Sequence, residues 1–177
     1  KSDYCPTNKL KLTIDKEKIL ALGIVDSSEA NKIVDEAKWK IKGQGFAKNQ
    51  LMVLDILANF SWERPIYFAI TVGNDNFMGL EDYFQLEGLA YRFVPIKTKS
   101  LDGQTGIVAT DEMYDNLINK FKWGNMGDPS VYLDETNMRM TMNFRNNFAR
   151  LADALIMEDQ LEKAENVLDR CIEVMPN

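Results

Sequence analysis

Two neighbouring stretches, NFSWERPIYFAI at residues 59–70 and GLEDYFQLEGLAYRFVPIK at residues 79–97, carry a dense mixture of aromatic, acidic and arginine side chains. Residues 65–72 form a nearly continuous apolar run, which predicts a central strand buried on both faces. Residues 89–96 predict a second strand, which Pro95 moves toward an edge or an end of its sheet. We expect these two strands to organise the core.

The sequence before these stretches predicts a strand followed by two short helices. Residues 10–14 alternate apolar and polar side chains, as a half-buried strand does. Asp15 then stands where an N-cap is needed, and Gly23 where a helix ends. Asp26, followed three residues later by a glutamate, has capping-box spacing and predicts the start of the second helix.

Residues 37–42 alternate strictly and predict a strand with one basic face, formed by Lys38, Lys40 and Lys42. These lysines have two interpretations. They are either a binding stripe or solvated charges that protect an edge strand from pairing with another chain. We favour the second.

Residues 50–60 are apolar on nearly every side and predict a helix packed against several neighbours. Asp55 is the one charge in this segment, and burying it without a partner would cost several kcal/mol, on the order of the penalty for an unpaired buried charge. Arg64 follows within a turn. We therefore predict a structural ion pair between Asp55 and Arg64, in preference to a catalytic acid at Asp55.

After a loop at residues 97–109, one more helix is expected before Gly124, with an apolar stripe formed by Met113, Tyr114, Leu117, Ile118 and Phe121. The resulting fold class is α/β (α+β), a small mixed β-sheet covered by helices. We assign this domain to residues 1–130 and a docked helical hairpin to residues 131–177.

The hairpin has the length and pattern of a tetratricopeptide (TPR) repeat, a helix-turn-helix unit of about 34 residues. Its first helix is expected to start near Glu135, after an Asp134 cap. We favour a packing hairpin over a peptide-binding groove. The signature positions before the closing Pro176 are Phe148, Leu151, Ala152, Leu155, Ala164, Leu168 and Cys171.

Composition excludes several classes of function. A net charge of −6 disfavours nucleic acid, and no apolar run approaches the length of a membrane span, which takes roughly 20 residues. The absence of histidine removes the usual general base and zinc ligand. We expect no metal and no cofactor. Cys5 and Cys171 could pair only if the chain ends meet.

Two turns are candidates for ligand binding. Trp62, Glu63 and Arg64 could form an aromatic platform with charged flanks, as sugar-binding sites do. Glu81, Asp82 and Glu87 surround Tyr83 and could act as acid and base on a glycan, although helix capping is the favoured role. No catalytic residue is assigned. The candidate ligand-binding residues are Trp62, Glu63, Arg64, Glu81, Asp82 and Tyr83.

Together with the opening stretches, four further segments carry a resemblance to one family. They are KTKS from residue 97, MYDNL from 113, FKWGNM from 121 and MTMNFRNNFARL from 140. The chain resembles the soluble C-terminal region of bacterial multi-span membrane proteins of the protein O-mannosyltransferase-like glycosyltransferase family.

The resemblance implies a periplasmic domain tethered to the inner membrane by the rest of the parent protein, with the catalytic carboxylates elsewhere in that parent. It implies a non-catalytic accessory role in which the chain binds or positions a polypeptide or glycan acceptor. Two alternatives stay open: a self-contained carboxylate-based glycan-processing enzyme around Glu63, Glu81 and Asp82, and a purely structural interaction domain.

Overall fold

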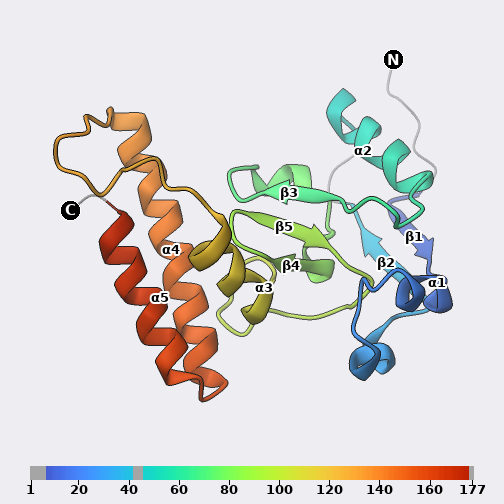
Figure 1. Ribbon diagram of the computed structural model, residues 1–177. Coiled ribbons are helices and arrows are strands. Elements are labelled where there is room, and N and C mark those ends of the chain that lie inside the picture. Colours follow the sequence, from blue (N-terminus) through green and yellow to red (C-terminus); the bar gives the residue numbers. More distant parts are fainter. Residues whose placement is uncertain (1–6, 42–45, 176–177) are drawn as a thin grey trace. The chain divides into compact units, whose positions relative to one another are not determined.

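A computed structural model of the chain describes residues 7–41 and 46–175 (Figure 1). Its strands form a two-stranded sheet, β1-β2, and a four-stranded sheet of order β3-β5-β4-β6, and helices make up the C-terminal part. The predicted α/β class is confirmed, with two small sheets where one was expected. Two compact units are present, residues 1–85 with 92–107 and residues 86–91 with 108–177. The predicted domains, 1–130 and 131–177, stay a prediction.

The first unit begins with an antiparallel ribbon of β1 (Lys9–Thr13) and β2 (Glu36–Lys40). Both predicted strands and both predicted caps are confirmed. Asp15 accepts a hydrogen bond from the backbone N–H of Lys18 at 3.0 Å and begins α1 (Lys16–Ala21). Asp26 accepts one from Ser28 at 2.8 Å, but the segment it begins, Ser27–Lys32, is a 3-10 helix.

The strand predicted at residues 65–72 is short and lies at the end of its sheet, so its prediction as a central strand is wrong. β3 (Tyr67–Ala69) buries only its middle residue, because Phe68 packs on an aromatic cluster while its two neighbours face solvent. β5 (Ala90–Phe93) lies between β3 and β4 (Phe84–Leu86), and β6 (Ile107–Val108) follows β4. Pro95 lies beyond the end of β5, where it interrupts no pairing.

The helix α2 (Lys48–Ala58) forms as predicted, but its predicted burial is wrong. Leu57 is its one buried residue, whereas Leu51, Met52 and Ile56 are at least half exposed. Asp55 is exposed too, and within the described residues no ion pair joins it to Arg64. A carboxylate in water needs no partner, which removes the reason for the predicted pair.

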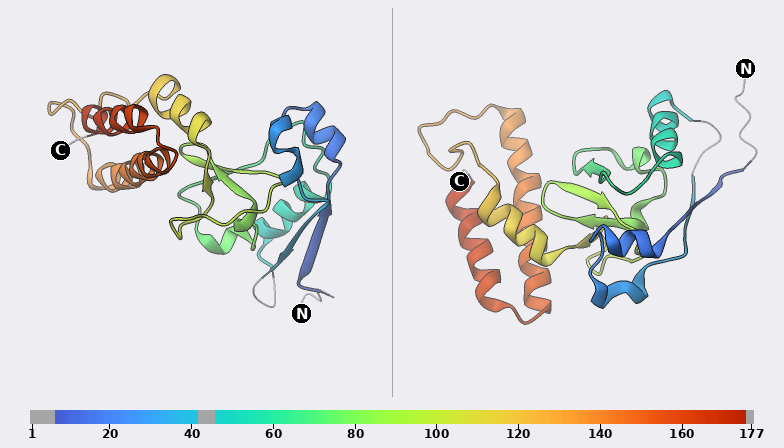
Figure 2. Two further views of the ribbon diagram at one scale, coloured as in Figure 1. Left: turned by 90° about the horizontal axis from the view of Figure 1, so that it is seen from below. Right: turned by 45° about the vertical axis from the view of Figure 1, so that its right-hand side comes forward.

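The second unit contains the helical hairpin. After α3 (Thr110–Asp115) and a π-helical turn at Asn116–Lys120, α4 (Glu135–Met157) and α5 (Leu161–Val174) lie side by side in every view (Figures 1 and 2). The predicted start of α4 is confirmed, since Asp134 accepts a hydrogen bond from the N–H of Asn137 at 2.7 Å.

The predicted seam of this hairpin is confirmed at Phe148, Leu151, Ala152, Leu155 and Ala164, which are all buried. Leu168 is wrong as a core position because 44% of it is exposed, whereas Val167 is fully buried. Cys171 is a half-buried free thiol, and Cys5 and Lys42 lie outside the described residues. No helix among the described residues combines the length and apolar character that crossing a bilayer requires.

The hairpin seam can be tested by two neighbouring substitutions. Val167→Ala removes two methyl groups from a fully buried position and should lower the free energy of unfolding by about 2 kcal/mol. Leu168→Ala is the matched control and should cost less than about 0.5 kcal/mol. Urea unfolding monitored by circular dichroism measures both values. Equal losses would show that α5 is rotated about its axis relative to the packing described.

Candidate functional site

The two aromatic candidates, Trp62 and Tyr83, are buried rather than displayed. Trp62 is 7% exposed and stacks on Phe93 with ring centroids 5.4 Å apart. Tyr83 is 2% exposed, and its hydroxyl accepts a hydrogen bond from the Lys38 backbone N–H at 2.8 Å and donates one to the Lys38 carbonyl at 3.1 Å. These contacts give both rings a structural role.

The charged candidates do not converge on one site. Glu63 forms an exposed ion pair with Lys18 at 3.3 Å, and Arg64 is exposed. Asp82 forms an ion pair with Lys97 at 3.4 Å, and the neighbouring Glu81 is half-buried. Of these side chains, Asp82 lines the cavity described next, and the others do not.

The cavity of about 600 Å³ lies along the β1-β2 ribbon in the first unit. Its lining includes five lysines and one aspartate, although the whole chain carries a net charge of −6. Its positive charge is therefore a local feature of the ribbon. The lining residues are Lys9, Leu10, Lys11, Lys38, Trp39, Lys40, Gly79, Asp82 and Lys97.

One wall of this cavity is held against the backbone of β2 at two points. The Tyr83 hydroxyl binds both backbone polar groups of Lys38. Two residues along β2, Gly79 adopts φ +85° and lies so close to the Lys40 carbonyl that any Cβ at this position would clash with it. A glycine is required here both for the backbone conformation and for the close approach.

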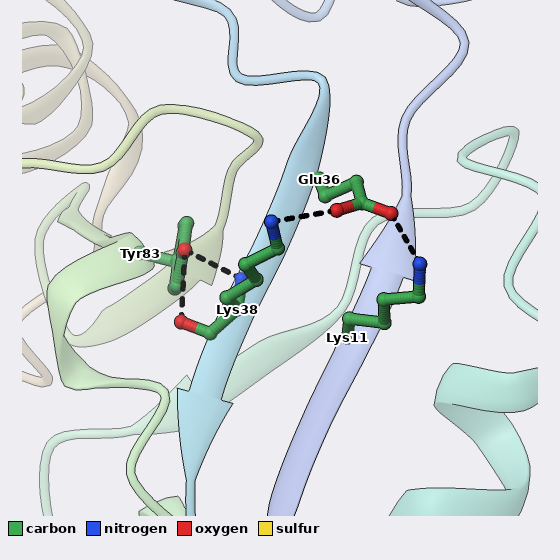
Figure 3. A network of polar contacts seen from close by, with 4 residues as sticks. All are labelled: Lys11, Glu36, Lys38 and Tyr83. Carbon is green, nitrogen blue, oxygen red and sulfur yellow. Dashed lines mark hydrogen bonds and ion pairs between the residues drawn. The ribbon is translucent and has the colours of Figure 1, made fainter.

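Glu36 neutralises part of the basic face. Its carboxylate accepts hydrogen bonds from the Lys11 ammonium at 2.5 Å and the Lys38 ammonium at 2.7 Å, and it lies between the two in Figure 3. The bonds from Lys11 and Lys38 lower the pKa of Glu36 to about 2. The hydrogen bond that Lys38 donates to Glu36 in turn raises the pKa of Lys38.

Of the residues that line this cavity, the sequence alone singled out Lys38 and Lys40 as a basic face and Asp82 as a candidate ligand-binding residue. The alternation of residues 37–42 identified the lysines of β2 and offered a binding stripe as one interpretation. Lys9, Lys11 and Lys97 were missed, because their place beside that stripe depends on the pairing register of β1 and on the fold around Lys97. The alternation of lysines at residues 9 and 11 was the available signal.

This arrangement favours binding over catalysis. Among the residues that line the cavity, Asp82 is the single carboxylate, so a two-carboxylate mechanism lacks its second group there. No cluster of metal-ligating side chains occurs in residues 7–41 and 46–175. Five lysines in the lining suit a ligand that carries negative charge.

A second cavity, of about 590 Å³, lies within the other unit, and three aromatic residues, Phe121, Trp123 and Phe144, contribute to its lining. The Trp123 ring packs at 5.9 Å from Phe144 and 6.1 Å from Phe121. The Trp123 indole N–H is buried and has no acceptor in the part of the chain that the structure describes. The remaining lining residues are Leu89, Lys120, Lys122, Gly124, Met126, Leu133 and Asn137.

Comparison with known proteins gave one match. The family model described as TMEM260-associated domain 2 matches residues 1–112, which include the ribbon and every residue that lines the basic cavity. No curated protein and no solved structure matches the chain.

The acid sensitivity of the ribbon should depend on Glu36. Because its pKa is lowered from 4.5 to about 2, Glu36 stabilises the folded chain above pH 4.5, and this stability is lost as the pH falls toward 2. Glu36→Gln should therefore flatten the decline in thermal midpoint between pH 4.5 and 2. Glu17→Gln, at an exposed carboxylate of α1, is the control. A decline unchanged in Glu36→Gln would refute the charge assignment.

Proposed function

The chain belongs to the TMEM260-associated domain 2 family, and from this membership we propose that it is a non-catalytic accessory module of a membrane glycosyltransferase-like protein. The family description ties the domain to TMEM260, a membrane protein. On this proposal the module lies on the extracytoplasmic side, tethered by the rest of the parent, and binds and positions a polypeptide acceptor.

The observation that carries this proposal is the open basic cavity along the β1-β2 ribbon. It follows the ribbon, which suits a long ligand better than a compact one. Lysine ammonium groups supply electrostatic attraction along the ribbon. An extended polypeptide can place charged side chains along the same length.

The C-terminal hairpin has a supporting part in this proposal. Its buried seam and the Asp134 cap fit a TPR-like packing hairpin. The exposed apolar side chains of α5, Leu161, Leu168 and Ile172, leave a stripe along that helix. We assign this pair to packing within the parent rather than to acceptor binding.

The proposal is tested by following the Trp39 backbone N–H signal in nitrogen-15 NMR spectra of the chain. A panel of unstructured acidic, neutral and basic dodecapeptides should contain members that shift this signal and leave the Trp123 signal in place. Incubation of the same peptides with nucleotide-linked or lipid-linked sugar donors should give no glycosylated product by mass spectrometry. A glycosylated product, or a Trp39 signal unmoved by every peptide, would contradict the proposal.

A second candidate function, glycan binding, is favoured by the aromatic cavity of the other unit. Sugar rings stack on aromatic side chains, and Phe121, Trp123 and Phe144 line this cavity. Short neutral oligosaccharides should then shift the Trp123 signal, and Phe144→Leu should weaken their binding severalfold without altering the circular dichroism spectrum. Arg139→Ala, at an exposed residue of α4 that does not line this cavity, is the control. An unmoved Trp123 signal would exclude this candidate.

A further inference from the structure

The pairing register of the ribbon places lysines directly opposite one another. Lys9 faces Lys40 and Lys11 faces Lys38. The flanking pairs exchange backbone hydrogen bonds, as from the Ile41 N–H to the Asn8 carbonyl, so the lysine pairs occupy the positions without such bonds. There the facing Cα atoms are only about 4.5 Å apart, and their side chains lie on one face.

Only one of these two pairs has its charge offset. Glu36 binds Lys11 and Lys38, whereas Lys9 and Lys40 form no ion pair with any described residue. Like charges that face each other across strands destabilise a sheet. Protection of an edge strand explains scattered lysines, but it does not require that they face each other beside a cavity. An anionic ligand would remove this repulsion.

Trp39 lies on the other face of the ribbon from these lysines, because side chains alternate along a strand. Its side chain is only 9% exposed and packs in the core, where its indole N–H is buried without an acceptor among the described residues. The indication of a ligand therefore comes from the unbalanced lysines of the exposed face.

We propose that the cavity takes an extended acidic polypeptide segment, with carboxylates at alternate positions. Alternate side chains of an extended chain are about 6.8 Å apart, which is also the spacing of Lys9 from Lys11 and of Lys38 from Lys40. A compact oxyanion such as phosphate lacks this repeat. The inference rests on the proposed function and specifies the chemistry of the polypeptide.

The free edge of β1 adds a way to hold such a segment. β1 pairs with β2 and with no other described strand. Because Lys11 occupies a position without hydrogen bonds to β2, its backbone N–H and carbonyl face away from the ribbon. An added strand that paired with these groups would lie beside β1, where its carboxylates would reach Lys9 and Lys11.

Stability in the absence of ligand provides the first test. At low ionic strength, Lys40→Gln should raise the thermal midpoint of the chain, because it removes the repulsion from Lys9. Lys38→Gln, two residues along the same strand, is the matched control and should lower it, because Glu36 loses a partner. A lower midpoint in Lys40→Gln would overturn the argument from repulsion.

Peptide binding provides the second test. Acetylated peptides that repeat Glu-Thr should bind the wild-type chain more tightly than peptides that repeat Gln-Thr or Lys-Thr, and added salt should weaken the binding. Lys40→Gln should weaken it by about fivefold, near the upper range for one exposed ion pair. Lys32→Gln, at an ion pair outside the cavity, should leave it unchanged.

The outcomes separate this inference from the function on which it rests. Equal binding of Gln-Thr and Glu-Thr peptides would overturn the acidic specificity and leave the proposed function standing. Binding of inorganic phosphate with no binding of Glu-Thr peptides would replace the polypeptide by a compact anion. Failure of every peptide to bind would overturn both proposals.

Discussion

The hydroxyl group of Tyr83 takes the place of a third strand beside β2, and the arrangement of the first unit depends on it. A two-stranded ribbon has two unpaired edges and little stability alone. By bonding both backbone polar groups of Lys38, Tyr83 closes one edge and ties the ribbon to the aromatic core around Phe93. The opposite edge, on β1, stays free. The ribbon is thus anchored on one side and available on the other.

The sequence was sufficient to predict the features that depend on neighbouring residues, namely helix caps and strand alternation. The caps Asp15 and Asp134 begin helices at the predicted residues, and the alternation in β2 gives the predicted buried and exposed faces. Burial was harder to predict, because an apolar run does not reveal how many neighbours it meets. α2 and β3 both read as central elements, yet each keeps most of its surface in solvent.

The candidate site illustrates the same limit. Aromatic rings near acidic residues look alike in sequence whether they bind a ligand or fill a core, and Trp62 and Tyr83 fill the core. The basic face instead comes from two segments about 30 residues apart in the chain, joined by an antiparallel register. Only that register brings Lys9 opposite Lys40. The lysines of one strand alone are equally consistent with an edge protected from mispairing and with half of a binding site.

Side chains alternate between the two faces of this ribbon, so its charge pattern depends more on the number of residues in each strand than on any one side chain. A one-residue insertion or deletion within β2 would turn Lys38 and Lys40 toward the core and bring Ala37 and Trp39 to the surface. Substitutions, by contrast, change one charge at a time. The number of residues between Glu36 and Ile41 should therefore stay constant in the family that shares this ribbon.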